Sequence, residues 1–179
     1  RPLISNINHL FIVQSIKQPE FSYLLVFKYL TYANMNNIKA SIILTKEDKF
    51  VDKAKIQEII ETFNKINIDV FVVSNKKKNG IEDKKIILGV AAVWDRRKGL
   101  EDFIKLSEMI DAMKNEISCL IGQTGVGKSS LINSIDPNYE RKVGEYSKSL
   151  GRGKHQTKEV VLLPFNGGFI ADTPGFSSL

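Results

Sequence analysis

The chain has 179 residues, of which 42% are hydrophobic and 26% are charged, proportions typical of a globular protein that buries a core. The longest apolar run, residues 86–94, is interrupted by a glycine and is too short to span a bilayer, and no secretory signal opens the chain. The single Cys119 excludes an internal disulfide, and with only His9 and His155 beside it no zinc site can be assembled. We therefore expect a cytoplasmic protein that is not bound to a membrane.

The formal net charge is +6, with 26 Lys and Arg against 20 Asp and Glu. A basic excess of this size suits a polyanionic partner such as RNA, and an AT-rich genome also produces it by favouring Lys, Asn and Ile. Both explanations stay open, and the basic clusters at residues 76–78 and 95–98 are expected to be solvated surface. The chain has no initiating Met and stops within a loop, so we expect it to be the central domain of a longer protein.

The first half of the chain is predicted to alternate strands with helices. Runs of apolar and β-branched residues predict buried strands at residues 10–16, 40–44 and 69–73. Residues 19–36 and 53–66 are predicted helices, the first opened by Pro-Glu-Phe-Ser and ended by two asparagines. Apolar residues at helical spacing are Leu24, Leu25, Phe27 and Leu30 in the first helix, and Ile56, Ile59, Ile60 and Phe63 in the second. This alternation implies a parallel sheet with right-handed crossovers.

Regular structure is least distinct between residues 75 and 98, where only 85–93 has the apolar character of a strand. A helix is predicted over 100–113, followed by a strand over 117–121. The residues expected to face inward from this helix are Leu100, Phe103, Ile104 and Ile110.

A polar segment after residue 136 runs to about residue 158, and its length predicts a mobile functional loop. Apolar residues at 160–163 and 169–171, joined by Asn-Gly-Gly, predict a hairpin behind it. The hairpin delivers the tetrapeptide that begins at Asp172.

Residues 122–130 read GQTGVGKSS between a predicted strand and a predicted helix, and this is the Walker A pattern. Glycines let backbone N–H groups turn inward around a polyphosphate, and the helix N-terminus adds positive potential. We expect Lys128 to reach the β and γ phosphates and Ser129 to hold Mg²⁺ through its hydroxyl. The predicted nucleotide-binding residues of this loop are Gly122, Gln123, Thr124, Gly125, Val126, Gly127, Lys128, Ser129 and Ser130.

Asp172-Thr173-Pro174-Gly175 has the Asp-x-x-Gly pattern that completes the phosphate site of a GTPase. The carboxylate of Asp172 is expected to steady Mg²⁺ through water, and the N–H of Gly175 to bind the γ-phosphate. Because the pattern follows a Walker A motif and stands on a strand, it favours a GTPase over an ordinary turn.

Thr45-Lys46-Glu47-Asp48 resembles the guanine-reading motif Asn-Lys-x-Asp, with Thr45 in place of Asn. Asp48 would accept hydrogen bonds from guanine N1 and N2, and the aliphatic stem of Lys46 would cover the base. Ser74 and Asn75 end the following strand, where a backbone N–H would meet guanine O6. Taken alone, the motif is also compatible with a charged helix entry after a strand.

These base-reading motifs precede the phosphate loop, the reverse of the order in ordinary small GTPases, so the domain is predicted to be circularly permuted. With this order, four segments resemble the RsgA family of small-ribosomal-subunit biogenesis GTPases: RPLISN at 1–6, QPEFS at 18–22, GRGKHQT at 151–157 and ADTPGFSSL at 171–179. The resemblance implies a three-layer α/β P-loop NTPase fold with a mostly parallel sheet. It makes residues 1–179 one GTPase domain with an insertion near 75–98.

The resemblance also implies function and partners. It implies a monomeric enzyme that hydrolyses GTP to GDP with Mg²⁺, is stimulated by the small ribosomal subunit and its rRNA, and acts late in subunit maturation. It further implies an N-terminal OB-fold and a C-terminal zinc-binding domain, both outside these residues.

Within the resemblance, Thr157 matches the switch threonine that binds Mg²⁺, and Gln156 stands where the family often has a further threonine. Phe176 occupies the place where many GTPases have a water-orienting Gln, and the family assigns that task to a histidine matched by His155. The residues implied to act in catalysis are thus His155, Lys128 and Thr157, with Ser129, Thr157 and Asp172 at the metal. A contact of His155 with RNA phosphate is the alternative.

Three other functions remain as alternatives. An ATP-dependent P-loop protein would keep the phosphate loop but leaves residues 45–48 unexplained. An RNA-binding assembly module would carry an inert nucleotide site. A related permuted GTPase that acts on another ribosomal particle is disfavoured by the Gly-Arg-Gly-x-His loop at 151–155.

Overall fold

The computed structural model describes residues 6–17, 19–45, 53–74, 90–93, 106–136, 139 and 161–173. The elements in chain order are β1 (His9–Ser15), α1 (Tyr23–Met35), β2 (Lys39–Thr45), α2 (Lys53–Asn64), β3 (Asp69–Ser74), β4 (Val90–Val93), α3 (Leu106–Ala112), β5 (Ile117–Ile121), α4 (Lys128–Ile135), β6 (Val161–Phe165) and β7 (Gly168–Asp172). The predicted alternation of strands and helices is confirmed. Among the described helices the longest has 13 residues, and none combines the length and apolar character needed to cross a membrane.

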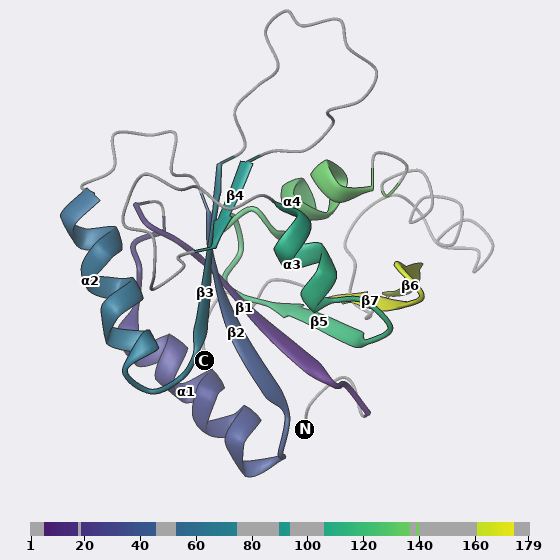
Figure 1. The fold of residues 1–179 in the computed structure, drawn as a ribbon, viewed down its shortest axis with the longest axis horizontal. Helices are drawn as coiled ribbons and strands as arrows, with labels where there is room; N and C mark the ends of the chain where they lie inside the picture. Colours follow the sequence, from purple (N-terminus) through teal and green to yellow (C-terminus); the bar gives the residue numbers. More distant parts are fainter. Residues whose placement is uncertain are drawn as a thin grey trace, which may run out of the picture.

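The strands form one seven-stranded sheet in the order β4-β3-β2-β1-β5-β7-β6. The five central strands, β3, β2, β1, β5 and β7, pair in parallel with one another. The edge strands β4 and β6 pair antiparallel with β3 and β7. Helices α1 and α2 cover one face of the sheet, and α3 and α4 cover the other (Figure 1). The predicted three-layer α/β fold with a mostly parallel sheet is therefore confirmed.

Strand β1 lies at the centre of the sheet and is buried along its whole length, so it reads as an apolar run without alternation. Leu10 and Ile12 pack on the α1 and α2 side, in one core cluster. Phe11 and Val13 pack on the α3 and α4 side, in the other. The two clusters hold the parallel strands in register, which brings the carboxyl ends of β1, β2, β5 and β7 to one edge.

Helix α1 begins at Tyr23, directly after the Pro-Glu-Phe-Ser segment predicted to open it, and ends as predicted at Asn36. Ser22 caps it by accepting a 3.3 Å hydrogen bond from the N–H of Leu25. The fully buried residues are Val26, Tyr29 and Ala33. Of the predicted apolar positions, Leu25 and Leu30 pack partly buried against the core, whereas Leu24 and Phe27 are 69% and 43% exposed. The apolar spacing therefore missed the centre of the buried face.

The core residues predicted for α2 are confirmed, whereas the one described core residue predicted for α3 is only partly buried. In α2, all four predicted core residues are buried, namely Ile56, Ile59, Ile60 and Phe63. Met109 of α3 and Met113, the residue after its end, are fully buried and Ile110 only partly, so the flexible methionines rather than Ile110 fill the core. Leu100, Phe103 and Ile104 lie outside the described residues.

The predicted hairpin of β6 and β7 is confirmed, with Asn166 at φ 46° and Gly167 at φ 81° in its two-residue turn. A side chain on Gly168 would place its Cβ 2.1 Å from the backbone oxygen of Glu116, so the hairpin lies directly on the turn before β5. This close approach sets β7 beside β5 in parallel.

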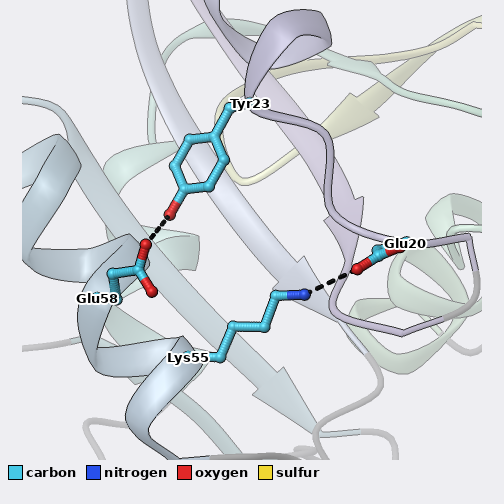
Figure 2. Close-up of polar contacts among 4 residues, drawn as sticks. All are labelled: Glu20, Tyr23, Lys55 and Glu58. Carbon is cyan, nitrogen blue, oxygen red and sulfur yellow. Dashed lines mark hydrogen bonds and ion pairs between the residues drawn. The ribbon is translucent and has the colours of Figure 1, made fainter.

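Two polar contacts join helix α2 to the start of α1 and to the segment before it (Figure 2). The Nζ of Lys55 lies 2.9 Å from Oε1 of Glu20, and the hydroxyl of Tyr23 donates to Oε1 of Glu58 at 3.3 Å. Both contacts are exposed, so each contributes little to stability. They nevertheless link α2 to the chain that leaves β1 and enters α1.

Candidate nucleotide-binding site

The predicted site residues that the structure describes gather at the carboxyl edge of the parallel strands. Thr45 ends β2, Ser74 ends β3, Asp172 ends β7, and β5 runs directly into residues 122–127. Ligands of open α/β folds bind at this edge, where loops leave the sheet. Motifs far apart in the sequence are thereby brought to one side of the molecule.

Residues 122–127 form a glycine-dependent loop between β5 and α4. A side chain on Gly122 would place its Cβ 2.2 Å from the backbone oxygen of Val13, so only glycine fits there. Gly125 and Gly127 have φ of +80° and +100°, and the space beside Gly125 is open to 4 Å. The predicted order of strand, phosphate loop and helix is confirmed.

Helix α4 offers an anion-binding end. Its N-cap, Gly127, makes no side-chain capping bond, and its first turn carries no acidic residue. The first backbone N–H groups of a helix have no partner within the helix and carry partial positive charge. The end of α4 that meets the loop is thus suited to a phosphate group.

Lys128 lies inside the loop rather than in solvent, with 7% of its surface exposed. Its Nζ donates to the backbone oxygen of Gly122 at 2.7 Å and to that of Gln123 at 3.1 Å. These bonds direct a buried positive charge at the curve of the loop. A polyphosphate in the loop would meet both this ammonium group and the N-terminus of α4.

Thr45 connects the end of β2 to the phosphate loop. It is 1% exposed, and its hydroxyl donates to the backbone oxygen of Val126 at 2.5 Å and lies 3.3 Å from that of Gln14. A hydroxyl has only one proton, and Thr45 donates it to Val126. This bond makes Thr45 an anchor of the loop at residues 122–127. Direct contact of Thr45 with a guanine base stays a prediction.

The residues predicted to hold Mg²⁺ belong to neighbouring elements. Ser129 is exposed in the first turn of α4, and Asp172 pairs in register with Leu120 of β5. The hydroxyl of Thr173 donates to the backbone oxygen of Leu120 at 2.7 Å and fixes the chain as it leaves β7. Within the described ranges no group of three or more His, Cys, Asp or Glu could hold a metal alone. A hydroxyl and one carboxylate fit Mg²⁺, which commonly takes its other ligands from phosphates and water.

Other predicted residues lie outside the described ranges, so the structure does not place them. They are Lys46, Asp48, Asn75, His155, Thr157 and Gly175. Ser130 is exposed in the first turn of α4 beside Ser129, and Thr124 is exposed in the loop.

Sequence reasoning missed Gln14, the last residue but one of β1. It is 0% exposed, and neither its Nε2 nor its Oε1 has a hydrogen-bond partner among the residues that the structure describes. The signal was a carboxamide at the end of the apolar run that begins at Leu10. Thr173 was also missed, because the Asp-x-x-Gly pattern leaves its second position unspecified.

His9 lies at the opposite edge and is a buried structural residue. Its Nε2 and the Oγ of Ser41 are 2.9 Å apart, and its ring stacks on Phe11 with centroids 4.0 Å apart. Burial, followed by the positive charge of Lys39, lowers the pKa of His9 from 6.5 to about 4. The ring is neutral at pH 7 and belongs to the core.

Comparison with known proteins agrees with this geometry. The family model for the RsgA GTPase matches residues 1–93 and 96–179. The small ribosomal subunit biogenesis GTPase RsgA of Bacillus velezensis is 37% identical over 182 residues, covering 100% of this chain and 53% of the relative. The protein of the same name from Bacillus subtilis is 35% identical, with the same coverage. The chain spans about half the length of the curated relatives that it matches.

Solved structures show the same fold. YloQ, described as a circularly permuted GTPase, is 29% identical with a TM-score of 0.62, over 97% of this chain and 46% of that one. YjeQ from Thermotoga maritima is 25% identical with a TM-score of 0.61, over 96% of this chain and 49% of that one. In the sequence, the motif predicted to read the base, residues 45–48, precedes the loop at residues 122–130, which is the permuted order. The chain therefore belongs to the RsgA GTPase family.

Proposed function

We propose that this chain binds GTP and GDP with Mg²⁺, hydrolyses GTP to GDP and phosphate, and serves in the maturation of the small ribosomal subunit. The observation that carries the proposal is the phosphate loop itself. Buried Lys128 is held by the oxygens of Gly122 and Gln123, next to the uncapped N-terminus of α4. A loop built in this way suits the polyphosphate of a nucleotide.

Choice of guanine is proposed to come from the segment after β2. Thr45 hydrogen-bonds the loop at Val126, so the chain enters residues 46–48 from a point fixed on the phosphate site. Asp48 would accept hydrogen bonds from guanine N1 and N2, which adenine does not offer, while Lys46 would cover the base. A backbone N–H of Ser74, which ends the neighbouring β3, or of Asn75, the next residue in the sequence, would meet O6.

Bound Mg²⁺ would neutralise charge on the phosphate oxygens, with Ser129, Asp172 and Thr157 as the residues that hold it. Lys128 and the loop N–H groups would stabilise charge on the transferring group. His155 would orient the attacking water, whose oxygen bonds to the γ-phosphorus as the bond to the bridging oxygen of GDP breaks. Gly175 would bind the γ-phosphate and respond to its loss.

The ribosomal part of the proposal draws on the names of the relatives and on the charge of +6. We propose that the small subunit and its rRNA complete the site by ordering residues 151–157, in the cytoplasm and on a monomeric protein. Residues 1–179 are proposed to act as one GTPase domain within the longer protein.

Phosphate release from GTP by the full-length protein, with and without purified small subunits, tests the proposal. We expect slow release alone and strong stimulation by the subunits, and loss of stimulation but not of GTP binding in His155→Ala. No release even with subunits present would favour the alternative of an RNA-binding module with an inert site.

A further inference from the structure

The side chain of Gln14 lacks hydrogen-bond partners among the described residues at the carboxyl edge of the sheet, where the candidate nucleotide-binding site lies. Its carboxamide is fully buried in the central strand, yet both of its polar atoms lack partners within the described residues. A buried amide without partners is costly, and folded proteins retain few of them. The carboxamide therefore needs a partner that the described residues do not supply in this arrangement.

Strand register places Gln14 beside the phosphate loop. Ile12 of β1 pairs with Ile121 of β5 in parallel, and the next residue, Gly122, still lies against the backbone oxygen of Val13. Extending the register two residues past Ile12 and Ile121, the last pair of β1 and β5, would set Gln14 alongside Gln123. Ile12 and Ile121 pack on the same core cluster, so both glutamines follow residues of the α1 and α2 face.

The side chain of Gln123 has a buried acceptor without a partner among the described residues, which could pair with the donor of Gln14. Its backbone oxygen accepts from Lys128, but its side-chain Oε1 is buried and, among the described residues, without a partner. The Nε2 of Gln14 is a donor and the Oε1 of Gln123 an acceptor, so one hydrogen bond would satisfy both. Neighbouring residues of paired strands lie close enough for side chains of this length to meet.

We propose that Gln14 is a positioning residue of the phosphate loop. Its carboxamide donates to the carboxamide of Gln123 when the loop closes on a polyphosphate, so nucleotide binding pairs the Nε2 of Gln14 with the Oε1 of Gln123, two of the three side-chain atoms of this pair that have no partner among the described residues. This inference rests on the proposed nucleotide binding and adds a residue that the sequence motifs do not include. Because the hydrogen bond forms only in the closed loop, it favours the ligand-bound state selectively.

Gln14→Met in the full-length protein tests the inference, because methionine keeps the length of the side chain and removes the amide. Without nucleotide, we expect a higher unfolding temperature, since an unpaired buried amide is gone. The affinity for GDP with Mg²⁺ should fall roughly tenfold, about 1.4 kcal/mol. A glutamine with a purely structural role would shift stability and affinity in the same direction.

Gln57→Met is the matched control. Gln57 on α2 also has a buried Oε1 without a partner in the described part of the chain, but its Nε2 donates to Glu61 on the same helix. We expect no change in GDP affinity in this variant. The main-chain oxygen of Gln14, which Thr45 approaches, is unaltered by the Met substitution.

Gln123→Met and the double variant complete a cycle of affinities, and Gln123→Met alone, which should lose GDP affinity to a similar extent, keeps the inference testable if Gln14→Met folds poorly. The loss in the double variant should be no larger than that in Gln123→Met alone, because both changes remove one hydrogen bond. Additive losses, or a GDP affinity of Gln14→Met within about twofold of wild type, would overturn the inference. If GDP with Mg²⁺ neither binds nor stabilises the wild-type protein, the proposed function itself fails.

Discussion

The two edges of the parallel sheet treat buried polar groups differently. At the amino edge, the Nε2 of His9 bonds Ser41 of the neighbouring strand and the ring stacks on Phe11. At the carboxyl edge, Lys128 and Thr45 bond backbone oxygens of the loop at residues 122–127. Both edges retain buried side-chain atoms without partners within the described ranges, the Nδ1 of His9 and the Oγ of Ser118 at the first and atoms of Gln14 and Gln123 at the second. The edges therefore differ in what their partnered groups contact, which is a neighbouring strand at the first edge and the loop of the candidate site at the second.

Removing the ammonium group of Lys128 is the largest test of this difference. Lys128→Ala takes away the buried charge and its bonds to Gly122 and Gln123. We expect GDP and GTP affinity to fall roughly a thousandfold, about 4 kcal/mol, because charged hydrogen bonds to phosphate are strong. Equilibrium titration with a fluorescent nucleotide measures this loss, and Lys114→Ala, on an exposed turn, is the control that should bind normally.

Lowering the pH should reduce the stability of the protein through His9, at the amino edge of the sheet. With a pKa near 4 in the folded chain and 6.5 when unfolded, the unfolded state binds more protons between these values. Stability should therefore decrease as the pH falls from 6.5 to 4, by up to about 3 kcal/mol from this group. Thermal unfolding across this range should show a flatter pH dependence in His9→Gln. An identical dependence in both proteins would mean that His9 is not the titrating group.

Gly122→Ala should disrupt the contact between the phosphate loop and β1. The added methyl group would meet the backbone oxygen of Val13 at 2.2 Å, which cannot move without disturbing the central strand. We expect a loss of about 2 to 3 kcal/mol in the free energy of unfolding, measured by urea denaturation. Gly125→Ala provides a comparison, because there the cost comes from φ of +80° alone and should be smaller.

Thr45→Val is the smallest of these changes. It preserves shape but removes the hydroxyl that donates to Val126, leaving a buried backbone oxygen without that partner. The free energy of unfolding should fall by about 1 to 2 kcal/mol, and nucleotide affinity should fall with it. Thr45→Ser keeps the donor and should bind nucleotide more tightly than Thr45→Val; equal affinities would remove the anchoring role.

The fold was predictable where local pattern and tertiary packing agree. The helical spacing of Ile56, Ile59, Ile60 and Phe63 gave the core face of α2, and Asn166-Gly167 gave the hairpin turn. Pattern failed in α1, where Val26, Tyr29 and Ala33 are buried and Leu24 is exposed. Which of two apolar stripes a helix buries depends on the shape of the sheet beneath it, and one sequence does not specify that shape.

The loop of the candidate site was predictable, but its supports were not. The Walker A spacing identified residues 122–130, because each glycine and the lysine has a fixed role in the pattern. The bond from Thr45 to Val126 joins residues 81 apart, and the juxtaposition that we infer for Gln14 and Gln123 depends on the register of β1 and β5. Such contacts arise from the order of strands in the sheet and carry no local signature.

Competition between nucleotides tests the central claim most directly. Fluorescent GDP bound to the full-length protein with Mg²⁺ would be titrated with unlabelled GTP and with ATP. We expect GTP to displace the label at micromolar concentrations and ATP to fail at concentrations roughly a hundredfold higher, since Asp48 would read guanine. Equal displacement by ATP, or no binding of the label, would contradict guanine-nucleotide binding at this loop.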